Sequence, residues 1–333
     1  MADVSVEDRE EDGFGSLFED QKSDQDTGDD VDPALTEEDY TRPTPPLSPS
    51  SGLTGEKVVP PTLRLSLVSS RHSLWGHRLW NAALLLAEMV DKDELVVAGK
   101  SVLELGAGAG LPALICALKG ASKVVISDYA TCTDNALMVP IQINIDRVQP
   151  EFVPESTLHA VGHVWGHAVE DLLAPLREAD NGDGDDSSVE GEGAAGRENA
   201  EVVACSGGVV SAGGGGGGAA RGGGGDTGGF DVVIMADLLF NRSQHAQLLE
   251  TCDRCLQKGS DKGTVWVSFS HHDPEKAELD MKFFDLAREK GFVAARIKAV
   301  QMRDLFVEND GLDDLRGEVH LWCLKRRLTP SEP

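Results

Sequence analysis

Three alternate glycines follow a short apolar segment of the chain, and an acidic side chain stands just before them. The run is Glu104-x-Gly106-x-Gly108-x-Gly110, with Ala107 between the first two glycines. Glycines let a backbone approach a bound molecule closely, and a helix that begins directly after them adds positive potential from its N-terminus. These residue types in this order predict a turn that binds a nucleotide or a nucleoside.

The spacing of the glycines narrows the kind of ligand. A dinucleotide-binding fingerprint would place its third glycine at position 111, where the chain has Leu111. An acid two residues before the first glycine is instead similar to the first motif of methyltransferases that use S-adenosylmethionine. A glycine-rich turn that binds nothing is the alternative. The apolar segment 101–105 predicts a buried parallel strand, and Leu111 begins the helix that follows the turn.

Asp128 ends the next predicted strand, 123–128, about 20 residues beyond the glycine turn. A carboxylate at this place accepts hydrogen bonds from ribose hydroxyls in dehydrogenases and in methyltransferases. Asp128 therefore indicates a ribose but does not distinguish the two classes. It is also placed to cap a helix that begins near Ala130, and the two roles are compatible.

Asp237 and Trp80 are two further candidates. Asp237 follows the continuous apolar strand 232–235 and Ala236, so it lies at the carboxyl edge where open α/β sheets bind ligands. It either faces a ligand there or caps the next helix. Trp80 precedes the first central strand and is either a core residue or an indole that lies over a ligand, including a sulfonium cation.

Hydrophobic patterns predict the elements that position these residues. Strands are predicted at 101–105, 123–128, 158–164, 232–235, 264–270, 293–300 and 318–324, and helices at 82–90, from 111, at about 130–147 with a bend at Pro140, at 242–257 and from 274 to 290. Helices separate the first six strands, and the last two strands could form an antiparallel hairpin. The predicted fold is α/β: a seven-stranded Rossmann-like sheet of the class I methyltransferase type, mainly parallel with an antiparallel closing hairpin.

The net charge of −27 is concentrated outside this fold. Residues 1–62 hold 17 acidic and four basic residues and many prolines, which predicts a disordered N-terminal tail. Residues 177–229 hold 19 of the 37 glycines and predict a disordered insertion in a surface loop. The domain is therefore expected at 63–327 without that insertion, followed by a short tail at 328–333.

Composition also limits the partners. No basic stripe is visible, and an acidic chain repels phosphates, so nucleic-acid binding is not expected. No apolar stretch reaches the length of about 18 residues that spans a membrane, and no signal peptide is visible. We expect a cytoplasmic monomer with reduced cysteines. Cys252 and Cys255 have no second pair for zinc, so no metal site is predicted.

Four further motifs indicate a resemblance to a known protein family. They are His77-Arg78-Leu79-Trp80-Asn81-Ala82, Val164-Trp165-Gly166, Ala236-Asp237-Leu238-Leu239-Phe240-Asn241 and His271-His272-Asp273-Pro274. Together with the glycine turn, they resemble the seven-strand protein-lysine methyltransferases of family 16 over about 63–327, apart from the insertion. Within that family they are similar to a fungal branch that modifies protein N-termini and lysines and was once named for nicotinamide N-methylation.

The resemblance implies that S-adenosylmethionine is the cofactor and that Trp80, Glu104, Gly106, Ala107, Gly108, Asp128, Trp165 and Ala236 form its binding site. It implies that Asp237 faces the amine that receives the methyl group. Phe240 stands where many relatives have tyrosine, so a hydroxyl role there is excluded. The implied substrate is translation elongation factor 1-alpha, at its N-terminal glycine and the adjacent lysine. A small-molecule N-methyltransferase that acts on nicotinamide or a similar amine, and a non-catalytic binding protein, remain as alternatives.

Overall fold

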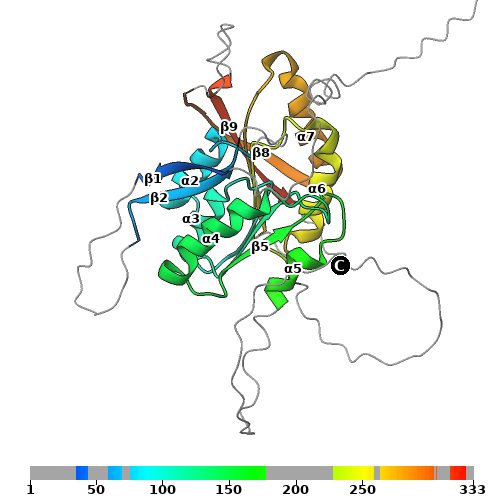
Figure 1. Ribbon diagram of the computed structural model, residues 1–333. Helices are drawn as coiled ribbons and strands as arrows, with labels where there is room; N and C mark the ends of the chain where they lie inside the picture. Colours follow the sequence, from blue (N-terminus) through cyan, green and yellow to red (C-terminus); the bar gives the residue numbers. More distant parts are fainter. Residues whose placement is uncertain are drawn as a thin grey trace, which may run out of the picture.

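The computed structural model describes residues 35–43, 59–69, 76–177, 228–258, 263–303, 305 and 316–327. Its elements, labelled as in Figure 1, are β1 (Leu35–Thr41), β2 (Thr62–Val68), α2 (Asn81–Asp91), β3 (Ser101–Leu105), α3 (Leu111–Leu118), β4 (Lys123–Asp128), α4 (Met138–Phe152), β5 (Leu158–Gly162), α5 (Glu170–Arg177), β6 (Val232–Ala236), the 3₁₀ turn η2 (Arg242–Gln244), α6 (His245–Cys255), β7 (Thr264–Ser270), the 3₁₀ turn η3 (Pro274–Lys276), α7 (Ala277–Glu289), β8 (Phe292–Gln301) and β9 (Glu318–Arg326).

Seven of these strands form one sheet in the order β5-β4-β3-β6-β7-β9-β8. The five strands from β5 to β7 are parallel, and β9 runs antiparallel between β7 and β8. This topology confirms the predicted fold class, including the closing hairpin. The chain extends the sheet outward from β3 to β5 and then returns to place β6 on the other side of β3. Ligands bind at the carboxyl ends of strands beside such a switch point.

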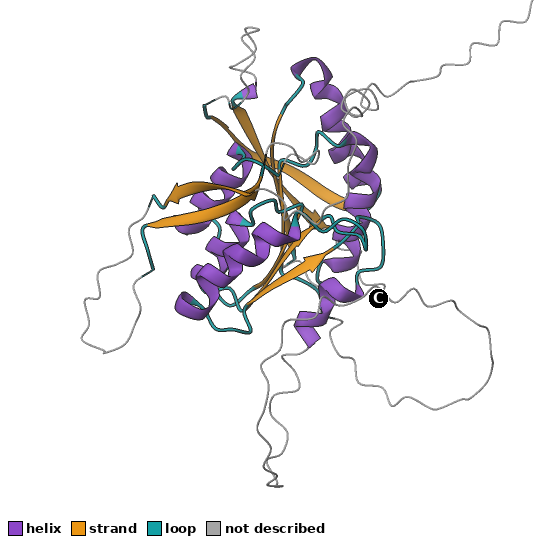
Figure 2. Cartoon of the chain, viewed as in Figure 1, coloured by secondary structure: helices purple, strands orange, loops and turns teal. Residues whose placement is uncertain are grey.

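Helices cover both faces of the sheet (Figure 2). Successive side chains of a strand point to opposite faces, so one strand contributes to two cores. In β6, Val232 and Ile234 belong to the core shared with α2, α3 and α4, whereas Val233 and Met235 belong to the core shared with α5, α6 and α7. Burial on both faces explains why the central strands are continuously apolar in sequence.

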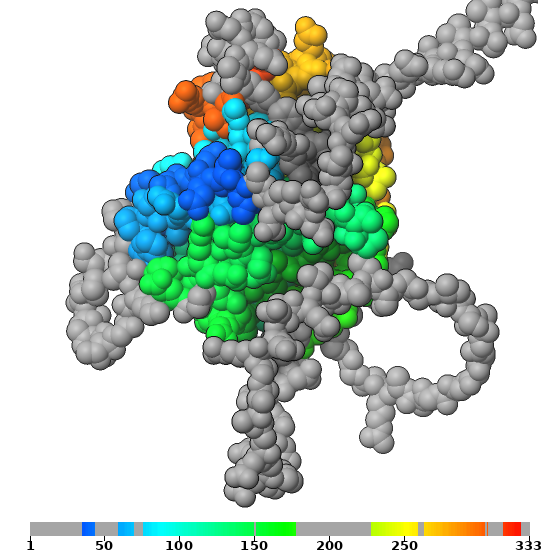
Figure 3. Space-filling model, in the orientation of Figure 1, coloured from blue at the N-terminus to red at the C-terminus, as the bar shows by residue number. Residues whose placement is uncertain are grey.

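Strand β1 corrects the prediction that residues 1–62 are disordered throughout. Residues 35–41 pair antiparallel with β2, and Tyr40 is buried against the core. Arg42 forms a buried ion pair with Asp91 at the end of α2, and Arg147 on α4 pairs with Glu37. In Figure 3 the β1–β2 ribbon, in blue, lies on the surface beside α4, in green. Composition missed this strand because pairing with β2 holds it in place, whereas its own side chains are exposed apart from Tyr40.

Helix α4 begins later than predicted. The chain runs irregularly from residue 129 to 137, where Thr131 N–H donates to the Asp134 carbonyl, and the helix starts at Met138. Pro140 is therefore in the first turn, where a missing N–H breaks no helical hydrogen bond, and the predicted bend was wrong. Of the expected insertion at 177–229, residues 178–227 lie outside the described residues. No helix in the described ranges has the length and apolar character needed to cross a bilayer.

Candidate active site

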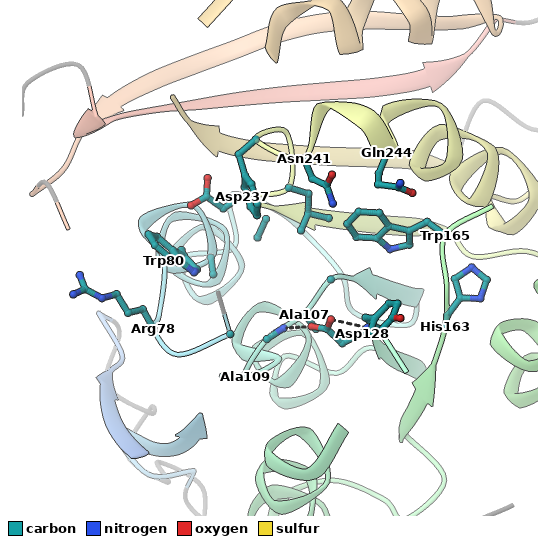
Figure 4. Close-up of a pocket in the computed structure, with 18 of the residues that line it drawn as sticks. Arg78, Trp80, Ala107, Ala109, Asp128, His163, Trp165, Asp237, Asn241 and Gln244 are labelled. Carbon is teal, nitrogen blue, oxygen red and sulfur yellow. Dashed lines mark hydrogen bonds between the residues drawn. The ribbon is translucent and has the colours of Figure 1, made fainter. Parts of the chain in front are cut away.

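A cavity of about 540 Å³ opens at the carboxyl ends of the strands on both sides of the switch point (Figure 4). Its volume is in the range of sites for nucleoside-sized ligands. Eight of the nine residues predicted for the site line it: Trp80, Gly106, Ala107, Gly108, Asp128, Trp165, Ala236 and Asp237. Glu104 is not among the lining residues. The topology therefore brings together motifs that lie as far apart as residues 80 and 237.

The glycine turn follows the carboxyl end of β3 and lines the cavity. Gly106, Gly108 and Gly110 all have positive φ, at 61°, 57° and 73°, a conformation that side chains other than glycine rarely adopt. A Cβ added at Gly106 would lie 2.6 Å from Leu238 and 3.1 Å from the indole of Trp165. A Cβ at Gly108 would meet nothing within 4 Å. The backbone is thus packed closely at the first glycine and open toward the cavity at the second.

Asp128 is held against this turn by the main chain. Its Oδ2 accepts a hydrogen bond from Gly108 N–H at 2.6 Å, and its Oδ1 accepts one from Tyr129 N–H at 2.6 Å. The nearest helix begins only at Met138, so Asp128 does not cap a helix. A carboxylate oxygen can accept more than one hydrogen bond, so these two bonds are compatible with a contact to ribose hydroxyls. Of the two roles that the sequence left open, the ligand-facing role fits the structure.

Asp237 has a left-handed backbone conformation, with φ of 60°, that is uncommon outside glycine. Its N–H donates to the Ser268 carbonyl at 2.7 Å, and its Oδ1 accepts from Ser270 N–H at 3.2 Å. Its Oδ2 lies 3.0 Å from Nε2 of His272. Asp237 does not cap the next helix, because Asn241 precedes the turn η2. Backbone strain of this kind concentrates at functional sites, and β7 holds the carboxylate at the cavity wall.

Comparisons with known proteins agree with this geometry. The family model described as "Lysine methyltransferase" matches residues 61–180. The protein N-terminal and lysine N-methyltransferase efm7 of Schizosaccharomyces pombe is 32% identical over 261 residues, which cover 78% of this chain and 81% of that protein. Its counterpart EFM7 from Gibberella zeae is 34% identical over 90% of this chain and 89% of its own length. The chain belongs to the family of protein N-terminal and lysine N-methyltransferases.

Among solved structures, the methyltransferase resembles Trm5b from Pyrococcus abyssi with a TM-score of 0.42 and 12% identity, over 84% of this chain and 57% of that one. A likeness at this level adds nothing to the sheet order described above. The assignment rests on the curated relatives, whose similarity extends over most of the chain. The family predicted from the motifs is therefore confirmed, and the chain is a methyltransferase.

Glu104 supports the methyltransferase turn from behind rather than lining its cavity. The side chain is buried, and its Oε2 accepts a hydrogen bond from Ala113 N–H at 2.9 Å, in the first turn of α3. Burial away from water raises the pKa of this carboxyl to about 8, with the Asp128 charge adding to the rise. Its position below the turn favours a structural role in connecting β3 to α3.

Asn144 also supports the turn, although no sequence pattern predicted this role. This buried side chain lies on α4 and donates to the Ala109 carbonyl at 3.0 Å and to the Ser66 carbonyl at 2.9 Å. Its Oδ1 accepts from Ser66 N–H at 2.7 Å. One amide therefore connects the glycine turn, α4 and β2. An isolated asparagine in a helical pattern carries no local signal of such a role.

Several lining residues were not among the predicted site residues, although each lies within or close to one of the motifs. They are Arg78, Ala109, Tyr129, His163, Asn241 and Gln244. Burial lowers the pKa of His163 to about 4, so this ring is neutral at physiological pH, and its Nε2 lies 3.3 Å from Thr251 Oγ1. Tyr129 is 39% exposed and can contact a planar group. Tyr129 follows Asp128 in the sequence, and His163 lies two residues before Trp165. This nearness in sequence was the signal that could have identified Tyr129 and His163.

Residues at and just before the start of α2 hold part of the chain that connects β8 to β9. Arg78 donates to the Leu305 carbonyl, and Asn81 Nδ2 donates to the Arg303 carbonyl at 2.6 Å. Arg78 and Leu305 also line a smaller hollow of about 350 Å³ next to the main cavity, together with Glu37 on β1. The rim of the methyltransferase cavity is therefore built from segments more than 200 residues apart in the sequence.

Proposed function

We propose that this enzyme transfers the methyl group of S-adenosylmethionine to the N-terminal glycine amine and the adjacent lysine of translation elongation factor 1-alpha. The observation that carries the proposal is the buried carboxylate of Asp237, which lines the cavity. The glycine turn and Asp128 line the same cavity. Such a cavity can hold a nucleoside on one side and an amine on the other.

The chain's residues fit S-adenosylmethionine. The open backbone at Gly108 leaves room for a ligand where a side chain would intrude, and the Asp128 carboxylate has lone pairs for a ribose diol. Trp80 and Trp165 bring indole rings to the same cavity, where an indole face attracts a sulfonium cation. When bound, the cofactor supplies a methyl group on sulfur with an excellent leaving group, so positioning and exclusion of water account for most of the catalysis.

The acceptor amine must be neutral to attack. An N-terminal amine has a pKa of about 8 and is partly neutral near physiological pH. A lysine side chain has a pKa of about 10.4, and its deprotonation at that pH costs roughly 4 kcal/mol. A buried pocket reduces this cost because burial disfavours the ammonium. Asp237 either orients the amine by accepting a hydrogen bond from its N–H, or takes its proton. Asp237 does not lower the pKa of the amine, because a nearby carboxylate favours the charged form.

The protein substrate is supported by the relatives, which are named as protein N-terminal and lysine N-methyltransferases. The choice of translation elongation factor 1-alpha rests on the resemblance of the motifs to the fungal branch. We also propose that the enzyme acts as a monomer in the cytoplasm, and its elution volume in size-exclusion chromatography would test the oligomeric state.

Intact-mass spectrometry of the elongation factor tests the proposal. Purified factor with a free N-terminal glycine is incubated with the full-length enzyme and S-adenosylmethionine, and the product is fragmented to place each added methyl. We expect mass increments of whole methyl groups on the first residue and on the adjacent lysine. Factor that has been acetylated at its N-terminus serves as the control, and it should gain methyl groups on the lysine alone.

Nicotinamide in a parallel reaction tests the alternative substrate class. Methyl transfer to nicotinamide with none to the elongation factor would overturn the protein substrate while leaving the methyltransferase assignment intact. Methyl transfer to the factor at other positions would overturn only the choice of site.

A further inference from the structure

The inference concerns His272, which follows β7 and stands in neither the predicted site nor the cavity lining. Its imidazole is stacked between two aromatic rings that do line the cavity. The ring of Phe240 lies 4.8 Å away at an interplanar angle of 12°, and the indole of Trp80 lies 5.2 Å away at 28°. The His272 side chain is 13% exposed. Two parallel neighbours fix the plane of the imidazole and leave its nitrogens in that plane.

Nε2 of His272 lies beside the acidic side chain at the cavity wall, at ion-pair distance but without the geometry of a hydrogen bond. The distance from Nε2 to Oδ2 of Asp237 is 3.0 Å, and the Asp237 side chain is only 3% exposed. The other oxygen, Oδ1, already accepts from Ser270 N–H. The imidazole therefore approaches the carboxylate oxygen that the main chain leaves available.

The backbone of His272 is fixed as well. Arg316 Nε donates to the His272 carbonyl at 3.3 Å. The preceding residue, His271, binds Asp280 through Nδ1 at 2.8 Å, and Arg242 Nε donates to the same buried carboxylate at 2.8 Å. The loop after β7 is thereby attached to α7 and to η2. Several independent contacts thus hold one imidazole against Asp237.

We propose that His272 is a positioning residue of methyl transfer: through the contact between its Nε2 and Asp237 Oδ2 it restrains the carboxylate that orients the acceptor amine. This inference rests on the proposed role of Asp237. His272 is not among the residues that line the cavity, so it acts through Asp237. The stacking by Trp80 and Phe240 then has a purpose in catalysis, because it holds the imidazole beside Asp237.

Three variants separate the donor from the ring. His272→Phe keeps a stacked ring and removes Nε2–H, His272→Gln keeps an N–H donor near the same place and removes the ring, and His272→Ala removes both. We expect kcat to fall about 10- to 100-fold in the Phe and Ala variants and to stay within about threefold of the wild type in the Gln variant, since orientation effects of this kind span such factors. Affinity for S-adenosylhomocysteine, KM for the peptide and the melting temperature should change little.

His159 on β5, outside the cavity lining, provides matched controls. His159→Phe and His159→Gln should retain wild-type kcat. Equal losses in the Phe and Gln variants of His272 would show that an N–H donor alone does not preserve kcat and would overturn the proposal. Wild-type kcat in His272→Phe would overturn it as well.

Nitrogen-15 NMR of labelled histidines tests the contact without any methyl transfer. The His272 signals are assigned by their absence in His272→Gln, and we expect a protonated Nε2 whose resonance shifts in Asp237→Asn. Unchanged His272 resonances in that variant would overturn the proposal. Should the wild type fail to methylate any peptide while His272 still responds to Asp237→Asn, the proposed function fails and the contact stands.

Discussion

Two walls of the cavity are built in different ways. The glycine wall, Gly106, Gly108 and Asp128, is made of main chain: positive-φ glycines, and a carboxylate tied to two backbone N–H groups. The aspartate wall, Asp237 and Phe240, is made of side chains and is supported from behind by His272 of a distant segment. A wall of backbone suits a cofactor that is always the same, whereas a wall of side chains can be adapted to an acceptor.

If this division is correct, changes on the two walls have separable effects. Substitutions on the aspartate wall should reduce the rate of methyl transfer and leave cofactor affinity unchanged. Substitutions on the glycine wall should reduce cofactor affinity first. The predictions below test this separation from the largest expected effect to the smallest.

Asp237→Asn tests the aspartate wall. Asparagine tolerates the left-handed backbone at this position, so the variant removes the charge without new strain. We expect kcat to fall by about 10²–10⁴-fold, the range for loss of a group that handles a proton, with unchanged calorimetric affinity for S-adenosylhomocysteine. Asp273→Asn, an exposed neighbour that is not among the lining residues, is the matched control and should keep wild-type activity. A tenfold loss of cofactor affinity in Asp237→Asn would contradict the separation of the two walls.

Gly106→Ala tests the glycine wall. The new Cβ would lie 2.6 Å from Leu238 and 3.1 Å from Trp165, so the side chains around the cavity must shift. Overpacking of this kind costs about 1–3 kcal/mol, and we expect cofactor affinity to fall at least about tenfold. Gly99→Ala is the control: it has the same left-handed φ, at 73°, with nothing within 4 Å of the new Cβ. It should lower the melting temperature and leave affinity alone. Equal losses of cofactor affinity in Gly106→Ala and Gly99→Ala would show that backbone strain at a positive φ, and not crowding of the cavity, causes the effect.

Asp128→Asn should have a smaller effect on the same wall. The amide keeps one acceptor oxygen and loses the charge, and its NH₂ group replaces an acceptor beside Gly108 N–H or Tyr129 N–H. Loss of one charge-assisted hydrogen bond weakens S-adenosylhomocysteine binding about tenfold. Calorimetry measures this, with kcat at saturating cofactor expected to remain close to that of the wild type. Asp146→Asn on α4, exposed and outside the lining, is the control. A fall in kcat without a fall in cofactor affinity would contradict the assignment of Asp128 to cofactor binding.

Glu104→Gln should change the pH dependence of stability and hardly affect catalysis. Because the folded-state pKa is raised to about 8, the wild type is stabilised by this group at low pH and loses that contribution as pH rises toward 8. The glutamine variant has no such loss. Its melting temperature relative to the wild type should therefore increase between about pH 5 and pH 8, by a few degrees. Parallel melting curves across this range would mean that the Glu104 carboxyl titrates normally in the fold.

The glycine wall could be predicted from the sequence because its signals are local. The strand, the three glycines, Asp128 and the strand order all follow from short-range patterns, and the topology then places them at one edge. His272 and Asn144 could not be predicted in this way. Their roles arise from contacts with residues tens to more than a hundred positions away, such as Trp80 and Ser66, and an isolated polar residue shows no sign of its partner.

The two errors in the fold have related causes. Residues 35–41 are acidic and polar, so their tendency to form a strand depends on β2 and on the buried pair that follows them. Pro140 was interpreted as a bend because the helix was placed eight residues too early, since the polar loop at 129–137 resembles the start of a helix. Local patterns do not locate a boundary that tertiary contacts decide.

The ion pair between Arg42 and Asp91 determines where this enzyme can be shortened. Removing everything before residue 62, as composition would suggest, leaves a buried aspartate without its cation, at a cost of about 3–5 kcal/mol. The same cut removes the cover from β2, whose leucines 63, 65 and 67 would then border an unpaired strand edge. A chain that starts at residue 35 should remain dispersed in solution, whereas one that starts at 62 should aggregate.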